Sequence, residues 1–145
     1  MKIIVARRKT GPTPHMEQAA LLLAEDHYWT DTTIQKNFSG FGDYWAGLMA
    51  FLPEMRNEAY LVTDGGEIVA IAVYSRQFDI HYGLIAVPTL VIVNSEHRND
   101  VATSREVVRL IRTCVRELNV NRYMTCQHVN ETTQIHKLRY LNGRS

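Results

Sequence analysis

The sequence has few cysteines and no metal-binding pattern. It contains two cysteines and six histidines in 145 residues. Cys114 and Cys126 lack the Cys-x-x-Cys spacing and lie in apolar surroundings, which predicts two buried thiols and no disulfide. No His-x-x-x-His or His/Cys pairing suits zinc. We therefore expect neither a disulfide framework nor a metal centre.

The sequence also lacks an excess of charge and a long apolar run. Sixteen basic and 15 acidic residues give a formal net charge of +1, so charge alone makes nucleic acid and membrane surfaces unlikely partners. No apolar run approaches the length of a membrane span. Residues 1–11 have a short apolar run followed by basic residues, the reverse of a secretory signal. We expect a cytoplasmic protein.

Length and composition indicate a globular chain with a substantial core. Hydrophobic residues make up 46% and charged residues 21% of the sequence, which is typical of one domain spanning 1–145. Hydrophobic periodicity predicts an α/β (α+β) fold. The expected elements are strand 3–6, helices 14–29 and 44–52, strands 59–63, 67–74 and 84–93, helix 103–118, strand 123–129 and a final helix 131–141.

Two local signals refine this order. Asp64-Gly65-Gly66 joins two β runs and predicts a hairpin, because glycine accepts positive φ. Pro88 interrupts the apolar strand 84–93, and proline cannot donate to a sheet ladder, so it predicts a bulge or a place where a neighbouring strand separates. The aromatic residues of the helical region form either a pocket roof or part of the core; they are Tyr28, Trp29, Phe41, Tyr44 and Trp45.

The stretch 84–108 combines a strand, a polar turn and a helix start. Thr103 and Ser104 are predicted helix caps, and Glu106 stands three residues after Thr103, as in a capping box. Unpaired N–H groups at such a helix start favour an anion. An ordinary strand-to-helix turn remains the alternative. The four arginines that follow share one helical stripe, which indicates a solvated face more than a nucleic-acid surface; they are Arg105, Arg109, Arg112 and Arg116.

Residues 93–103 resemble the acetyl-CoA signature of the GNAT superfamily of N-acetyltransferases, in which a valine leads through a polar turn into Arg/Gln-x-x-Gly-x-Gly/Ala. Val93 and Arg98 occupy matching positions, whereas Val101 and Thr103 replace the two glycines. The resemblance implies a mixed, mostly antiparallel sheet flanked by helices in the order βααβββαβα. After the last expected helix only residues 142–145 remain, so the C-terminal hairpin usual in the superfamily is expected to be missing.

The resemblance implies acetyl-CoA as cosubstrate and assigns residues to it. The backbone of Val91, Ile92 and Val93 is expected to hold the pantetheine and acetyl groups. Asn130, before the final expected helix, takes the asparagine position of the superfamily's second cofactor motif. The pyrophosphate is expected on Arg98 and on the amides of Asn99, Asp100, Val101, Ala102, Thr103 and Ser104.

Catalytic groups are harder to assign, because strand 84–93 has no ionisable side chain. For the general acid that protonates the leaving thiolate we favour Tyr140 and then His136. A water on Thr89, or Asp79, His81 or His128, would have to act as base, although a core histidine is the better explanation of His128.

Two functions follow from these residues. One is an acyltransferase that moves an acetyl group from acetyl-CoA to an amine acceptor, either a small molecule or a peptide. The alternative is a catalytically inactive GNAT-like binding or structural module in a larger assembly. The missing hairpin leaves a sheet edge that a second copy or an assembly partner could complete.

Overall fold

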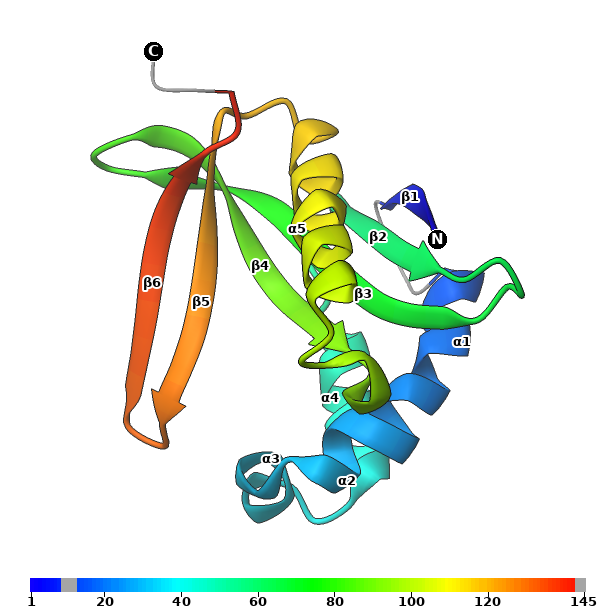
Figure 1. Cartoon of the computed structure of the whole chain (residues 1–145). Coiled ribbons are helices and arrows are strands. Elements are labelled where there is room, and N and C mark those ends of the chain that lie inside the picture. Colours follow the sequence, from blue (N-terminus) through cyan, green and yellow to red (C-terminus); the bar gives the residue numbers. More distant parts are fainter. Residues whose placement is uncertain (9–12, 143–145) are drawn as a thin grey trace.

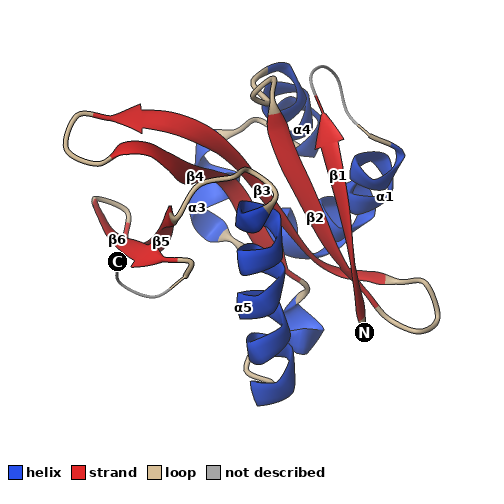
Figure 2. Ribbon diagram, turned by 90° about the horizontal axis from the view of Figure 1, so that it is seen from above, coloured by secondary structure: helices blue, strands red, loops and turns tan. Residues whose placement is uncertain are grey.

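The computed structural model describes residues 1–8 and 13–142. They form one mixed six-stranded sheet in which the strands lie in chain order, with helices on both faces (Figures 1 and 2). The strands are β1 (Lys2–Arg8), β2 (Arg56–Val62), β3 (Ile68–Asp79), β4 (Gly83–Val93), β5 (Arg122–Asn130) and β6 (Thr133–Tyr140). The helices are α1 (Pro14–Leu22), the π-helix η1 (Leu23–His27), α2 (Tyr28–Thr30), α3 (Thr32–Asn37), α4 (Phe41–Ala50), the 3-10 helix η2 (Ser95–His97) and α5 (Val101–Arg116).

The first four strands pair antiparallel in chain order, in agreement with the mostly antiparallel sheet that the resemblance implies. β2 and β3 are joined by the expected hairpin, in which Gly66 has φ +86°. All seven residues of β2 are buried. A strand buried along its whole length requires cover on both faces of the sheet.

The helical region begins as expected from its sequence. Thr13 accepts a hydrogen bond from the backbone N–H of Met16 at 3.1 Å, and Pro14 occupies the first helical turn. Four of the five aromatic side chains belong to the core rather than to a pocket roof: Tyr28 is buried, and Phe41, Tyr44 and Trp45 pack against the buried cluster beneath α1. Trp29 is exposed.

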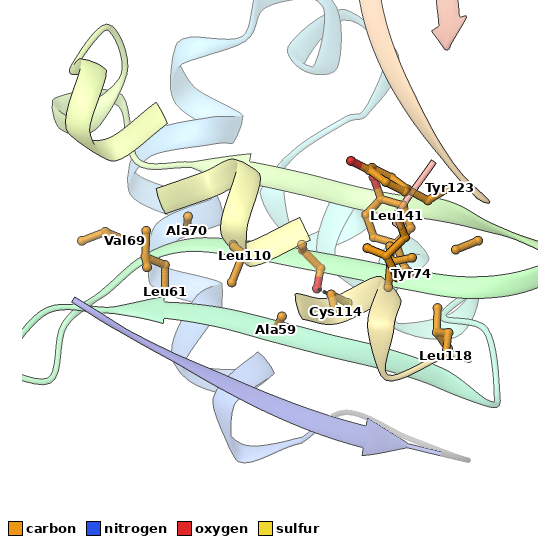
Figure 3. Close-up of a cluster of buried hydrophobic side chains, with 13 residues drawn as sticks. Ala59, Leu61, Val69, Ala70, Tyr74, Leu110, Cys114, Leu118, Tyr123 and Leu141 are labelled. Carbon is orange, nitrogen blue, oxygen red and sulfur yellow. Dashed lines mark hydrogen bonds between the residues drawn. The ribbon is translucent and has the colours of Figure 1, made fainter. Parts of the chain in front are cut away.

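Two hydrophobic cores lie on opposite faces of the sheet. Helix α5 packs on one face, where Leu110, Cys114 and Val115 contact the small residues of β2 and β3. Figure 3 shows Tyr74, Tyr123 and Leu141 gathered at one end of this cluster. Helices α1 and α4 cover the other face. Within the described ranges no helix is long and apolar enough to span a membrane.

The expected final helix is wrong. Residues 133–140 form β6, which pairs antiparallel with β5 from Arg122↔Tyr140 to Asn130↔Thr133. Ile135, Leu138 and Leu141 recur every three residues, which suits a helix, but the backbone groups of this segment are satisfied by β5 instead. The described chain therefore ends in a β5–β6 hairpin, made from the expected strand 123–129 and the segment expected as a helix, and no further pair of strands follows it among the described residues.

Candidate functional site

The β4 strand carries the bulge that Pro88 predicts. Val73 pairs with Leu90 and Tyr74 pairs with Pro88, so Thr89 has no partner on β3 and the register shifts there. The bulge lies midway along β4. A bulge bends its strand and increases the local twist, which redirects the following residues.

Beyond this point β4 and β5 separate. The two strands run parallel, and their single paired position in the described chain is Ala86↔Tyr123. From there β4 leads towards α5 while β5 diverges from it (Figure 1). We call the space between residues 87–91 of β4 and 124–128 of β5 the wedge.

The wedge contains a cavity of about 620 Å³. Its walls come from β3, the bulged part of β4, α5 and the β5–β6 hairpin. The lining residues are Tyr74, Gln77, Val87, Pro88, Thr89, Leu90, Val91, Ile111, Met124, Thr125, Cys126, His128, Gln134 and His136. No Asp, Glu, Lys or Arg is among these lining residues, as expected for a site that receives a mostly neutral arm.

Tyr74 fixes the narrow end of the wedge. Its hydroxyl donates to the carbonyl oxygen of Met124 at 2.9 Å, from β3 across to β5. Burial is the main cause that raises the pKa of the Tyr74 hydroxyl far above its usual range. Tyr74 is therefore a neutral donor that satisfies a β5 carbonyl which β4 no longer reaches.

A thiol and an imidazole face each other inside the wedge. Cys126 and His136 occupy directly opposite positions on β5 and β6, and Cys126 Sγ lies 3.9 Å from His136 Nε2. The other ring nitrogen, His136 Nδ1, lies 2.9 Å from Met124 Sδ. The sequence predicted a buried Cys126, which is wrong, because the residue is half-buried and lines the cavity. The sequence gives no sign that Cys126 and His136 lie together, because only the β5–β6 pairing brings them opposite each other.

The predicted catalytic residues separate into two places. His128 and His136 both line the wedge. Tyr140 instead lines a different cavity with Arg112 and Tyr123, and its ring contacts the Arg122 guanidinium at 5.0 Å. The structure therefore does not bring Tyr140 together with the two histidines.

The start of α5 differs from its prediction. The helix begins at Val101 and its cap is Asp100, not Thr103 or Ser104. The Asp100 carboxylate accepts from the Thr103 N–H at 3.3 Å and from its hydroxyl at 2.6 Å. These bonds, with the Thr103 hydroxyl first, lower the pKa of Asp100. A carboxylate already occupies the helix start, which reduces its attraction for a pyrophosphate.

Arg98 is held by the protein itself. Its Nε donates to the Val93 carbonyl at 3.1 Å, and a terminal nitrogen lies 3.6 Å from the buried Asp26 carboxylate, which also accepts from the Ser95 N–H at 2.7 Å. Arg98 remains 39% exposed at its side chain. Together with the predicted residues Val91, Ile92 and Val93 it lines a second cavity of about 450 Å³.

Asn130 does not precede a helix. Its side chain accepts from the Thr132 N–H at 2.9 Å and shapes the β5–β6 turn, which is an ordinary role for asparagine. No cluster of three or more possible metal ligands occurs in the part of the chain that the structure describes.

Comparison with known proteins shows the fold. No protein-family model and no curated protein matches the sequence. An acetyl transferase of Pyrococcus furiosus, so named provisionally, superimposes with a TM-score of 0.60 at 11% identity over 90% of this chain and 86% of its own. A probable acetyltransferase from Staphylococcus epidermidis superimposes with a TM-score of 0.56 at 17% identity, over 90% of this chain and 76% of its own. The chain has the fold of the GNAT acetyltransferases.

Proposed function

We propose that the protein is an acyltransferase that uses acetyl-CoA and acetylates an amine. The observation that carries the proposal is the separation of β4 from β5 beyond Ala86↔Tyr123, next to a cavity of about 620 Å³. The edge of β4 that faces β5 has no strand partner there among the described residues. Backbone N–H and C=O groups on such an edge can pair with the amides of an extended pantetheine arm, as an added strand would.

The shape of the wedge sets the orientation in which the pantetheine arm would bind. Its narrow end lies at Ala86 and Tyr123, and β4 leads from there to the start of α5. A nucleotide near Arg98 would therefore leave the thioester end of the arm near Pro88 and Thr89. The two structurally similar proteins are named as acetyltransferases, which supports acyl transfer as the reaction.

The acceptor is proposed to be a small-molecule or peptide amine. An amine must lose a proton before it attacks a thioester, and a neutral imidazole can accept that proton. His128 and His136 are the imidazoles that line the wedge. They replace the acidic side chain that β4 does not provide.

Calorimetric titration with acetyl-CoA tests the proposal. We expect a Kd tighter than roughly 100 μM, equivalent to about 5.5 kcal/mol. Val91→Trp should weaken binding strongly, because Val91 lines the wedge and a large ring would fill it. The control is Val129→Trp, on the exposed hairpin and outside the cavity lining. Absence of binding at millimolar acetyl-CoA would contradict the proposal.

A second candidate function is a GNAT-shaped binding module without catalysis. The observation that favours it is the Asp100 carboxylate at the start of α5, together with the pairing of Arg98 to Asp26. Both features satisfy internally the groups that the sequence assigns to a pyrophosphate. This module would show no acetyl-CoA binding, whereas the acyltransferase would bind the thioester and turn it over repeatedly only when an amine is present.

A further inference from the structure

We infer that Cys126 is the acyl-accepting nucleophile of the wedge and that acetyl transfer passes through a thioester on its sulfur. This inference rests on the proposed function and adds a covalent step to it. Its basis is the joint position of Cys126, His136 and Met124 in the cavity that would receive the thioester.

The first argument is the position of Cys126 along β5 relative to the bulge in β4. Ala86 and Tyr123 are paired, and parallel strands rise by nearly the same distance per residue. Three residues further along each strand lie Thr89, at the bulge, and Cys126. The thiol therefore lies at the level of the bulge, where the thioester end of an arm entering from α5 would stop. Both residues line the same cavity.

The second argument is the tautomer of His136. Met124 Sδ can only accept a hydrogen bond, so the tautomer of His136 that uses this 2.9 Å contact is the one with its proton on Nδ1. Nε2 then carries the lone pair, and it faces Cys126 Sγ at 3.9 Å. This is the general arrangement of an activated nucleophile, in which a base contacts the nucleophile and a third group orients the base. Here the three groups are Cys126, His136 and Met124.

The resting thiol has one competing partner. Cys126 Sγ also lies 3.6 Å from Gln134 Oε1, and both contacts are long. A rotation about the Cα–Cβ bond is enough to exchange them, and long contacts of this kind commonly tighten when substrate is bound. The remaining titratable groups of the cavity are His128 and the Tyr74 hydroxyl.

The proposed step balances without a redox partner. The Cys126 thiol gives its proton to His136 Nε2, and Sγ attacks the acetyl carbonyl carbon. The carbon–sulfur bond to CoA then breaks, and the imidazolium returns the proton to the departing CoA thiolate. An amine next attacks the acetyl group on Cys126, which restores the thiol. The acetyl group is transferred twice, with no net change in oxidation state.

The other cysteine provides an internal reference. Cys114 is a fully buried residue of α5, and its Sγ lies 3.5 Å from the Asn57 carbonyl and 3.8 Å from the Ala72 carbonyl. It has no imidazole beside it among these contacts. A thiol held in this way is inert towards a bulky reagent.

The test is mass spectrometry of the whole protein after incubation with acetyl-CoA and no amine. We expect one added acetyl group, removed by hydroxylamine and mapped to Cys126 and not to Cys114. Cys126→Ala should show no adduct. His136→Gln should slow adduct formation by about 100-fold, the lower end of what a general base contributes, and should slow the alkylation of Cys126 by iodoacetamide relative to wild type.

The outcomes separate this inference from the proposed function. If acetyl-CoA binds and amines are acetylated while Cys126→Ala retains full turnover and no adduct forms, direct transfer is the mechanism and the inference is wrong. If acetyl-CoA does not bind at all, the proposed function fails first and the inference fails with it. Cys114→Ala serves as the matched variant, because Cys114 does not line the wedge cavity, so the adduct on Cys126 should form as in wild type.

Discussion

The Tyr74 hydroxyl donates to the Met124 carbonyl at 2.9 Å, across the place where β4 and β5 part. Tyr74 belongs to the buried α5 core, and Met124 contacts the imidazole of His136. One hydrogen bond thus links the rigid part of the sheet to the hairpin that carries the proposed chemistry. Its removal is expected to affect both stability and binding.

Tyr74→Phe should lower the free energy of unfolding by about 1–2 kcal/mol, because a buried carbonyl loses its donor. It should also weaken acetyl-CoA binding, since β5 is no longer held at its distance from β4. Urea unfolding and calorimetry measure the two effects. Tyr82→Phe is the control, because Tyr82 is an exposed aromatic on the β3–β4 connection. Equal behaviour of the two variants would contradict this role of Tyr74.

Asp100→Asn should strengthen binding of acetyl-CoA and of CoA alone. Asparagine caps helices as well as aspartate does, so the variant removes a negative charge from the start of α5 and keeps the cap. Asp100→Ala removes both and should lower stability as well. Paired titrations at low and high salt would show the charge effect. Unchanged affinity in Asp100→Asn would mean that no anion approaches this helix start.

Asp100 also contributes to the pH dependence of stability. Its pKa is lowered in the folded protein, so the folded state binds its proton less readily than the unfolded state. The stabilisation is present above the unfolded pKa and is lost as the pH falls through the lower folded value. Wild type should therefore lose more stability than Asp100→Asn between about pH 5 and pH 3, as measured by urea midpoints.

Glu58→Gln should destabilise the fold by about 3–5 kcal/mol, because it removes the charge of a buried carboxylate that lies 2.7 Å from the Arg56 guanidinium. Glu58 accepts from Arg56 Nε at 2.9 Å and from the Thr13 hydroxyl at 2.5 Å, and its side chain is fully buried. The control is Glu117→Gln, which removes an exposed ion pair with Arg7 and should cost less than about 1 kcal/mol. Similar losses of stability in Glu58→Gln and Glu117→Gln would contradict the prediction, because they would mean that water reaches the Glu58 carboxylate.

Cys114 should titrate far above an ordinary thiol. Burial is the first cause that raises its pKa to about 12, against about 8.5 in an unfolded chain. The folded state then holds this proton more tightly, so stability is complete below about pH 8.5 and falls as the pH rises towards the folded value. Between these limits wild type should lose stability faster with pH than Cys114→Ala; parallel pH curves would contradict this.

Much of the fold could be predicted because its signals are local. Gly66 needs a positive φ, Pro88 cannot donate to a ladder, and Thr13 with Pro14 caps α1; each constraint acts within a few residues. The prediction of a helix at β6 was wrong for the opposite reason. Most of its residues are exposed, so no alternating burial marks it as a strand, and its conformation depends on pairing with β5.

The site was partly predictable for a related reason. The sequence located the bulged strand through Pro88 and placed His128 on the strand 123–129, but it named His136 on an expected helix that is the strand β6. It could not locate the Cys126 and His136 pair, because these residues meet only through the hairpin register. The Asp100 cap was missed because Thr103 offered an equally good capping pattern two residues into the helix.

The β5–β6 hairpin joins the sheet at one residue pair, and its turn is tied to α3 by an exposed ion pair between Lys36 and Glu131. Such a hairpin can open as a unit while the central strands stay closed. Deuterium should therefore enter the amides of the hairpin well before those of β2 and β3. Added salt, which screens exposed ion pairs, should speed that exchange. The rate at which the β5–β6 hairpin opens should therefore depend on ionic strength.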